Sequence, residues 1–259
     1  MDKMVTIAVI GLKGGVGKTT TATNIAYLLS REQDNRVLVM DADCQGNASS
    51  VFGEYDPDGI GMAQLMESVL EQKEVVLSDY VKKTGYGIDI IPANGYLMQT
   101  NGRLLVDSEN DQIHILSDAL QQCNGVYDYC IIDCGLQMDI TVANAALAAD
   151  LIINPLRLGG FEMSALDNLL TQTEDLRQLK KDIKVKSLIT MFQNNKFSRG
   201  LEEWLQGQKR FDFFATHIRN SVVVAKNSLS DGPVTYHSKN SNASKDYRAL
   251  VAELLQDWR

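Results

Sequence analysis

A glycine-rich segment near the start of the chain constrains the fold more than any other feature. It reads Gly-Leu-Lys-Gly-Gly-Val-Gly-Lys-Thr-Thr over residues 11–20, directly after the apolar run of residues 5–10. Glycines let the backbone turn so tightly that successive N–H groups point at one anion, and the amino end of a following helix adds partial positive charge. A strand, this loop and a helix in that order predict a phosphate-binding P-loop in an α/β protein.

The residue types in the loop predict a nucleotide site with ATP and Mg²⁺ as cofactors. We expect Lys18 to reach the β- and γ-phosphates and the Thr19 hydroxyl to bind Mg²⁺. The residues predicted to bind the nucleotide are Lys13, Gly14, Gly15, Val16, Gly17, Lys18, Thr19 and Thr20. A glycine-rich turn without a ligand is the alternative, and it is disfavoured because the strand, the lysine and the threonine are all in place.

Short apolar runs alternate with segments of helical period along the rest of the chain. Strands are expected at residues 5–10, 36–40, 88–91, 129–132, 151–154 and 185–191, and helices at 18–30, 113–122, 141–149, 164–179 and 244–258. Most of the runs are apolar on both faces, which is typical of parallel strands covered by helices on both sides. We predict a doubly wound, mostly parallel α/β sheet in a single domain, residues 1–259, with residues 52–82 and 195–240 as less regular additions.

Aspartates follow two of these runs. Asp41 and Asp43 end one strand, and because strand side chains alternate they share a face at the carboxyl edge, where open α/β sheets bind ligands. Asp133 ends another strand and is expected to hold the Mg²⁺ shell through water. Two interpretations of Asp41 stay open, namely support of the phosphate site and a carboxylate that caps a helix.

Composition narrows the class of protein further. The chain has 259 residues, 44% hydrophobic and 22% charged, which excludes fibrous and disordered classes. No apolar run approaches the roughly 18 residues of a membrane span, and residues 1–10 lack signal-peptide features, so we expect a cytoplasmic protein without a membrane partner. Cys44, Cys123, Cys130 and Cys134 fit no disulfide or zinc pattern and are expected to be reduced thiols.

Charge is distributed unevenly along the chain, whose net charge is -8. Residues 1–180 carry 12 Lys+Arg against 25 Asp+Glu, whereas residues 181–259 carry 13 against 8. The total argues against a polyanionic partner, but this asymmetry can place a basic face on an acidic body.

The loop sequence Lys-Gly-Gly-x-Gly-Lys-Thr resembles the deviant Walker A motif of the ATPases that include ParA/Soj partition proteins and MinD. The resemblance implies that Lys13 crosses a nucleotide-sandwiched homodimer and touches the partner's phosphates. Residues 41–47 are similar to the family's D-x-D-P-Q-G-N segment, which implies that Asp43 orients the attacking water and supports Mg²⁺ through water. On this basis the catalytic residues are Lys13, Lys18 and Asp43, and the metal-site residues are Thr19, Asp43 and Asp133.

The resemblance extends over nearly the whole chain, with two departures. Residues 88–94 are similar to the family's I-P-A-N strand, and residues 218–255 follow the family's closing order. Cys44 stands where the family has proline, and Gly135 and Leu136 replace two prolines of the second switch. Because proline fixes φ near -65°, we expect this switch to be looser than in relatives.

The ParA/Soj resemblance implies a partition function. In that group an ATP-dependent dimer binds DNA non-specifically through basic residues late in the chain, and a ParB-like centromere-binding partner stimulates hydrolysis. The predicted DNA-binding residues are Arg219, Lys226, Lys239 and Lys245, with a solvated basic rim as the alternative. Val222 occupies a second position that is basic in many relatives. The expected task is to segregate a plasmid, a chromosome or a mobile element, with nucleoid association if DNA is bound.

Other functions remain as alternatives. A MinD-like or pilus-positioning ATPase would localise an assembly without binding DNA, and an ATP-dependent ligase would use the P-loop to activate a carboxylate. Residues 247–258 carry apolar side chains at helical spacing opposite a face of mixed charge, which favours core packing over membrane insertion. An iron–sulfur reductase is disfavoured because no second cysteine accompanies Cys134 as a shared cluster requires.

Overall fold

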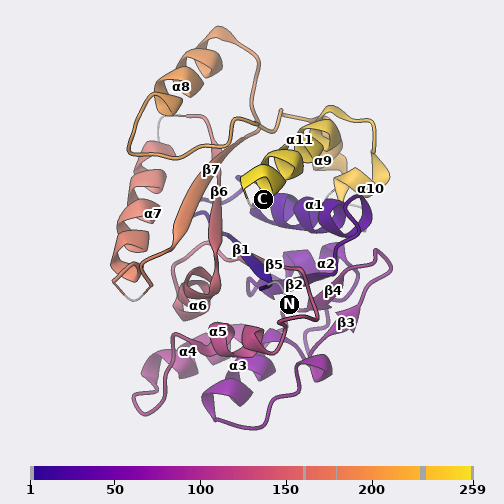
Figure 1. The fold of residues 1–259 in the computed structure, drawn as a ribbon, viewed down its shortest axis with the longest axis vertical. Coiled ribbons are helices and arrows are strands. Elements are labelled where there is room, and N and C mark those ends of the chain that lie inside the picture. The colour runs from indigo at the N-terminus through magenta and orange to yellow at the C-terminus, as the bar shows by residue number, and fades with distance from the viewer. Residues whose placement is uncertain (1–2, 160–161, 179, 228–231, 258–259) are drawn as a thin grey trace.

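The computed structural model describes residues 3–159, 162–178, 180–227 and 232–257 (Figure 1). Within these residues, seven strands form one sheet in the order β3-β4-β2-β5-β1-β6-β7. The strands are β1 Val5–Val9, β2 Val37–Ala42, β3 Lys82–Lys83, β4 Asp89–Ile91, β5 Tyr129–Cys134, β6 Leu151–Arg157 and β7 Lys184–Thr190. All neighbouring strands are parallel except β3, which pairs antiparallel with β4. The predicted mostly parallel α/β sheet is confirmed.

Helices cover both faces of the sheet. They are α1 Lys18–Arg31, α2 Asn47–Val51, α3 Met62–Leu70, α4 Leu97–Val106, α5 Ile115–Gln121, α6 Ile140–Ala148, α7 Glu162–Leu176, α8 Lys196–Gln206, α9 Val222–Asn227, α10 Val234–His237 and α11 Asn242–Asp257, with a short 3-10 helix at Leu77–Asp79. In Figure 1, α1, α10 and α11 group at one side, and α3, α4 and α5 group at another.

Alternating side chains of β1 divide the core in two. Ile7 and Val9 belong to the cluster that α1 and α11 cover, whereas Ala8 and the following Ile10 belong to the cluster that α3 to α6 cover. Both sets are fully buried. A strand that is apolar on both faces therefore lies between two layers of helices, as parallel sheets require.

The last helix, α11, packs into the core. Tyr247, Leu250, Val251 and Leu254 are buried in the cluster beneath α1, as the core-packing interpretation of this segment predicts. No helix in the described ranges combines the length and the apolar character needed to cross a bilayer. Residue 179 and Trp258, at the ends of two predicted helices, lie outside the described residues.

The segments expected to be less regular contain helices. Residues 52–82 include α3, and residues 195–240 include α8, α9 and α10. Helix α4 was not predicted, because Gly102 and other weak helix formers interrupt its pattern. Its stability comes from Leu97, Thr100 and Leu104, which are buried on one face. Tertiary packing thus overrides a weak local preference.

Candidate nucleotide-binding site

The glycine-rich loop leaves the carboxyl end of β1, which lies between β5 and β6, and enters α1 at Lys18. Gly15 and Gly17 have φ angles of 71° and 91°, a left-handed conformation that favours glycine. Gly17 is the N-cap of α1, and among the described residues no side chain caps the amides of the first turn. These amides point their partial positive charge at the loop, which suits an anion such as phosphate.

The Lys18 side chain runs close to Gly11 at the start of the loop. A Cβ on Gly11 would lie 3.3 Å from Oδ1 of Asn154, which is a tight contact, and 3.6 Å from Cδ of Lys18. Lys18 is 9% exposed. Burial lowers the pKa of Lys18, and the nearby carboxylates of Asp133 and Asp43 act against that shift. The ammonium therefore lies close to the two predicted metal-site carboxylates.

Asp41 is a structural carboxylate. The backbone N–H and the hydroxyl of Ser49, in the first turn of α2, both donate to Oδ2 of Asp41 at 2.7 Å. The N–H of Asp43 donates to the other oxygen at 3.2 Å. Burial raises the pKa of Asp41 to about 6, and the hydrogen bonds from Ser49 oppose this rise. These contacts support the capping interpretation of Asp41.

Asp133 is a buried carboxylate with little compensation from its neighbours. It is fully buried, and neither carboxylate oxygen has a hydrogen-bond partner among the described residues. Burial and the neighbouring Asp41 raise its pKa well above the ordinary value, whereas the Thr19 hydroxyl and Lys18 lower it. An unpaired buried carboxylate is costly, so its persistence beside Thr19 points to a cation as the missing partner.

The residues around Asp133 fit Mg²⁺. Thr19, Asp43 and Asp133 offer hard oxygen atoms, which Mg²⁺ prefers. In the part of the chain that the structure describes, no group of three or more His, Cys, Asp or Glu side chains could hold a metal alone. Mg²⁺ is commonly bound by one or two carboxylates together with water and substrate phosphates, so this sparse donor set suits a metal that arrives with a nucleotide.

Asp43 lies where the segment after β2 meets the segment after β5. It is half-buried, and its Oδ1 accepts a hydrogen bond of 3.0 Å from the N–H of Gln45. A Cβ on Gly135 would lie 3.7 Å from that oxygen, which places the segment after β5 against Asp43. The next residue, Leu136, is 48% exposed, and its side chain lies 3.7 Å from where a Cβ on Gly14 would be. Leu136 thus packs over the P-loop.

Asn101 on α4 joins these segments, and sequence reasoning missed it. Its Nδ2 donates to Asp139 at 3.1 Å and contacts the sulfur of Cys44 at 3.9 Å. Its Oδ1 accepts from the N–H and hydroxyl of Thr141 at 3.1 and 2.6 Å. One side chain therefore links the segment after β2 to the start of α6. No sequence signal marks it, because it lies in a helix without a clear pattern.

A cavity of about 140 Å³ opens beside the P-loop. Val16 and Gly17 line one side, and Thr190 and Met191 at the end of β7 line the other. The Thr190 hydroxyl donates to the carbonyl of Val16 at 2.8 Å, which ties β7 to the loop. The cavity adjoins the phosphate cradle and could receive another part of a nucleotide. Neither Thr190 nor Met191 was predicted, since only the fold brings them to the loop.

The predicted DNA-binding residues lie before, within or next to α9, α10 and α11. The guanidinium of Arg219 lines the cavity beside the P-loop and pairs with Asp246 through contacts of 2.6 and 2.9 Å. Lys226 lies in α9, Lys239 follows α10 and Lys245 lies in α11, and all three are exposed. The charge of Arg219 is therefore largely neutralised within the chain. Lys13, the predicted trans residue, is half-buried in the P-loop.

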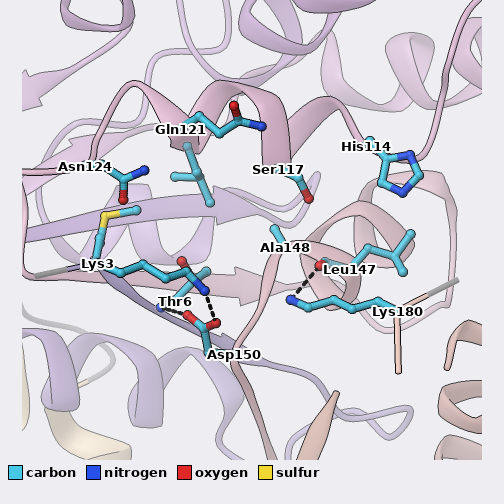
Figure 2. A pocket seen from close by; sticks show the side chains of 12 residues that line it. Lys3, Thr6, His114, Ser117, Gln121, Asn124, Leu147, Ala148, Asp150 and Lys180 are labelled. Atoms are coloured by element: carbon cyan, nitrogen blue, oxygen red, sulfur yellow. Dashed lines mark hydrogen bonds and ion pairs between the residues drawn. The ribbon is translucent and has the colours of Figure 1, made fainter. Parts of the chain in front are cut away.

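A larger cleft of about 320 Å³ lies at the opposite edge, by the amino ends of β1 and β6 (Figure 2). Its charged groups already have partners in the chain. Lys3 pairs with Asp150 at 2.7 Å, and Lys180 donates to the carbonyls of Leu147 and Ala149. These contacts join β1, α6 and the segment after α7. The cleft is thus a structural junction, and the P-loop edge is the candidate site.

A strand, a glycine-rich loop and a helix with Lys18, Thr19 and an acidic neighbouring strand define a P-loop nucleotide-binding protein. A family model described as an AAA domain matches residues 4–185. Chromosome partitioning protein ParA of Myxococcus xanthus is 30% identical over 96% of this chain and 87% of its own length, and that of Caulobacter vibrioides is 30% identical over 98% and 94%. The chain belongs to the ParA/Soj family of AAA-domain proteins.

Solved structures share the fold of this chain. A cobyrinic acid a,c-diamide synthase from Mycobacterium smegmatis, with an ATP analog and magnesium bound, has a TM-score of 0.81 and 27% identity over 98% of this chain and 96% of that one. A plasmid partition protein from Borrelia burgdorferi has a TM-score of 0.75 and 24% identity over 99% and 100%, which shows the shared fold.

Proposed function

We propose that this protein is a single-domain ATPase of the ParA type that dimerises around ATP and Mg²⁺ and hydrolyses ATP to ADP and phosphate. The observation that carries the proposal is the unpaired, fully buried carboxylate of Asp133 at the mouth of an uncapped P-loop helix. Such a site suits both an anion and a cation, and a nucleotide with its metal would supply both.

Each residue has a distinct task in the proposed reaction. The loop amides and Lys18 would hold the phosphates, and Thr19 and Asp133 would hold Mg²⁺, which would neutralise phosphate charge when bound. Asp43 orients the attacking water from the carboxyl edge of β2. Lys13 of a second copy contributes a further cation, as an arginine finger does. A looser Gly135-Leu136 switch would make turnover slow without a partner.

The proposed task is partition of a plasmid, chromosome or mobile element through non-specific DNA binding, with a ParB-like partner that stimulates hydrolysis. The exposed cations Lys226, Lys239 and Lys245 support this proposal, since they lie on the basic part of the chain. The charge of Arg219 is engaged by Asp246, so we propose that Arg219 shapes this surface more than it binds phosphate. The protein would act in the cytoplasm at the nucleoid.

Titration with an arbitrary duplex DNA across a salt series tests this task. Binding should appear with ATP and not with ADP, and its affinity should fall with salt by about 0.9 log units per log unit for each phosphate contact. Lys239→Glu with Lys245→Glu should weaken it, whereas Lys82→Glu on the edge strand β3 serves as the control. ATP-dependent dimers that ignore DNA would favour an ATPase that positions a protein assembly.

A second candidate follows from the similarity to a cobyrinic acid a,c-diamide synthase, which suggests carboxylate activation by ATP. Such a ligase would turn over ATP only with an acid substrate and an amide-nitrogen donor. ATP turnover by the purified protein should therefore be compared with and without cobyrinic acid and glutamine. Stimulation by these compounds and none by DNA would favour the ligase.

A further inference from the structure

The outer face of α8 exposes two aromatic side chains. Phe197 is 69% exposed and Trp204 is 51% exposed. They are seven residues apart and so share one face of the helix. Gly200 lies between them, and a Cβ there would meet nothing within 4 Å in the described part of the chain. In Figure 1, α8 lies at the outer end of the molecule.

The inner face of α8 is anchored to the rest of the protein. A loosely held helix is therefore not the reason why the two rings face outward. Leu205 is buried and Leu201 is half-buried in a small cluster that includes Leu156 of β6. Glu202 and His217 are hydrogen-bonded at 2.8 Å. The side chain of Asn195 caps the helix by accepting from an amide of the first turn. The aromatic face is thus presented by a fixed helix, and large exposed aromatics of this kind mark interaction sites.

Cations flank both ends of this face. Lys196 and Arg199 lie at the start of α8, and Lys209 and Arg210 follow its end, all exposed. Residues 196–210 hold these four cations against two carboxylates, and one of the two, Glu202, is engaged by His217. Arg210 contacts Asp167 at 3.0 Å. The aromatic face therefore has Lys196 and Arg199 at one end, and at the other end Lys209 beside an Arg210 whose charge Asp167 shares.

The charge pattern disfavours two possible occupants. A second copy of α8, parallel or antiparallel, would bring cations against cations at both ends. Duplex DNA would satisfy the cations, but its phosphates offer no apolar surface to cover Phe197 and Trp204. Shielding the two aromatic rings from water requires an apolar surface on the partner.

We propose that this α8 face binds an acidic amphipathic helix of a partner protein. Apolar residues three, four and seven apart on that helix would cover Phe197, Gly200 and Trp204, and its carboxylates would meet the flanking cations. Trp and Arg are the residue types that most often dominate binding energy at such interfaces. The proposal is separate from the nucleotide chemistry, because none of these side chains belongs to the P-loop edge.

Fluorescence anisotropy of two labelled synthetic peptides tests the proposal. Both are helical with leucines at heptad spacing; one carries glutamates beside the leucines and the other carries lysines. The acidic peptide should bind and the basic one should not. Phe197→Ala and Trp204→Ala should each weaken binding about tenfold or more, and the Lys196→Glu, Arg199→Glu double variant should weaken it and reduce its salt dependence.

The control is Leu105→Ala, which removes an equally exposed apolar side chain from α4. It should leave peptide binding unchanged, and all variants should keep wild-type ATP binding. The proposal is overturned if the acidic peptide does not bind, if both peptides bind alike, or if Trp204→Ala binds normally. If light scattering shows that Trp204→Ala no longer dimerises, the face is assigned to a contact between two copies of the chain. If DNA affinity is lost while peptide binding stays intact, the face is assigned to DNA.

Discussion

Asp133 of β5 lies directly opposite Asp41 of β2 in the parallel pairing of the two strands, yet only Asp41 has hydrogen-bond partners among the described residues. The two carboxylates have the same residue type, strand position and full burial. Ser49 satisfies Asp41 from within the chain, whereas we propose that a bound ligand satisfies Asp133. On this proposal one aspartate serves the fold and the other serves the site.

Asp133→Asn should stabilise the protein without nucleotide while impairing its function. The pKa of Asp133 is higher in the folded protein than in the unfolded chain. The carboxyl therefore lowers the free energy of unfolding once the pH exceeds about 4, and this effect grows as the pH rises. We expect a gain of about 1–3 kcal/mol, larger at about pH 8 than at about pH 5. Urea unfolding in EDTA measures it. Lower stability at both pH values would contradict the conclusion that burial of the Asp133 carboxylate is costly.

Lys18→Ala should abolish nucleotide binding, because the P-loop then lacks the cation that faces the phosphates. Isothermal titration with ATP and Mg²⁺ measures the loss. The variant also removes a buried ammonium, so circular dichroism must show that it is folded. Normal ATP affinity in the folded variant would refute the assigned role.

Lys13→Ala should keep ATP binding but lose ATP-dependent dimerisation, since the proposed contact of Lys13 is with the partner's phosphates. Light scattering with ATP, and with ADP as the control, reports the mass. An unchanged dimer would reject the trans contact, whereas lost ATP binding would assign Lys13 to its own subunit's nucleotide.

Asp43→Ala should bind ATP and dimerise but hydrolyse slowly, so that a stable ATP dimer accumulates. The expectation follows from its half-buried place beside Gly135, where it can face water. Phosphate release and light scattering on one sample separate the two properties. Full turnover in this variant would exclude Asp43 as the residue that orients water.

Asn101→Ala should destabilise the fold by about 1 kcal/mol and separate the segment after β2 from the start of α6, because four contacts of Asn101 join them. We expect kcat to change more than KM, since the P-loop stays intact. Gln99→Ala, an exposed change on the same helix, is the control. Equal effects of both variants on kcat would show that Asn101 has no special role.

Much of the fold could be predicted because its signals are local. The buried strands are continuous apolar runs, and the loop before Lys18 needs glycines at Gly15 and Gly17 for their left-handed angles. Helices α4 and α8 were missed because their stability depends on contacts with distant elements, such as that of Leu205 with Leu156. Local propensity carries no information about such contacts.

The amino-acid sequence by itself determined where the phosphate loop, the parallel strands and the aspartates at the carboxyl edge of the sheet lie, since each depends on neighbouring residues. Only the tertiary structure decided that Asp41 is satisfied and Asp133 is not, that Arg219 is paired with Asp246, and that Asn101 joins the segments around the site. The physical reason is that hydrogen bonding and charge compensation depend on which groups meet in space, and those groups lie up to tens of residues apart along the chain.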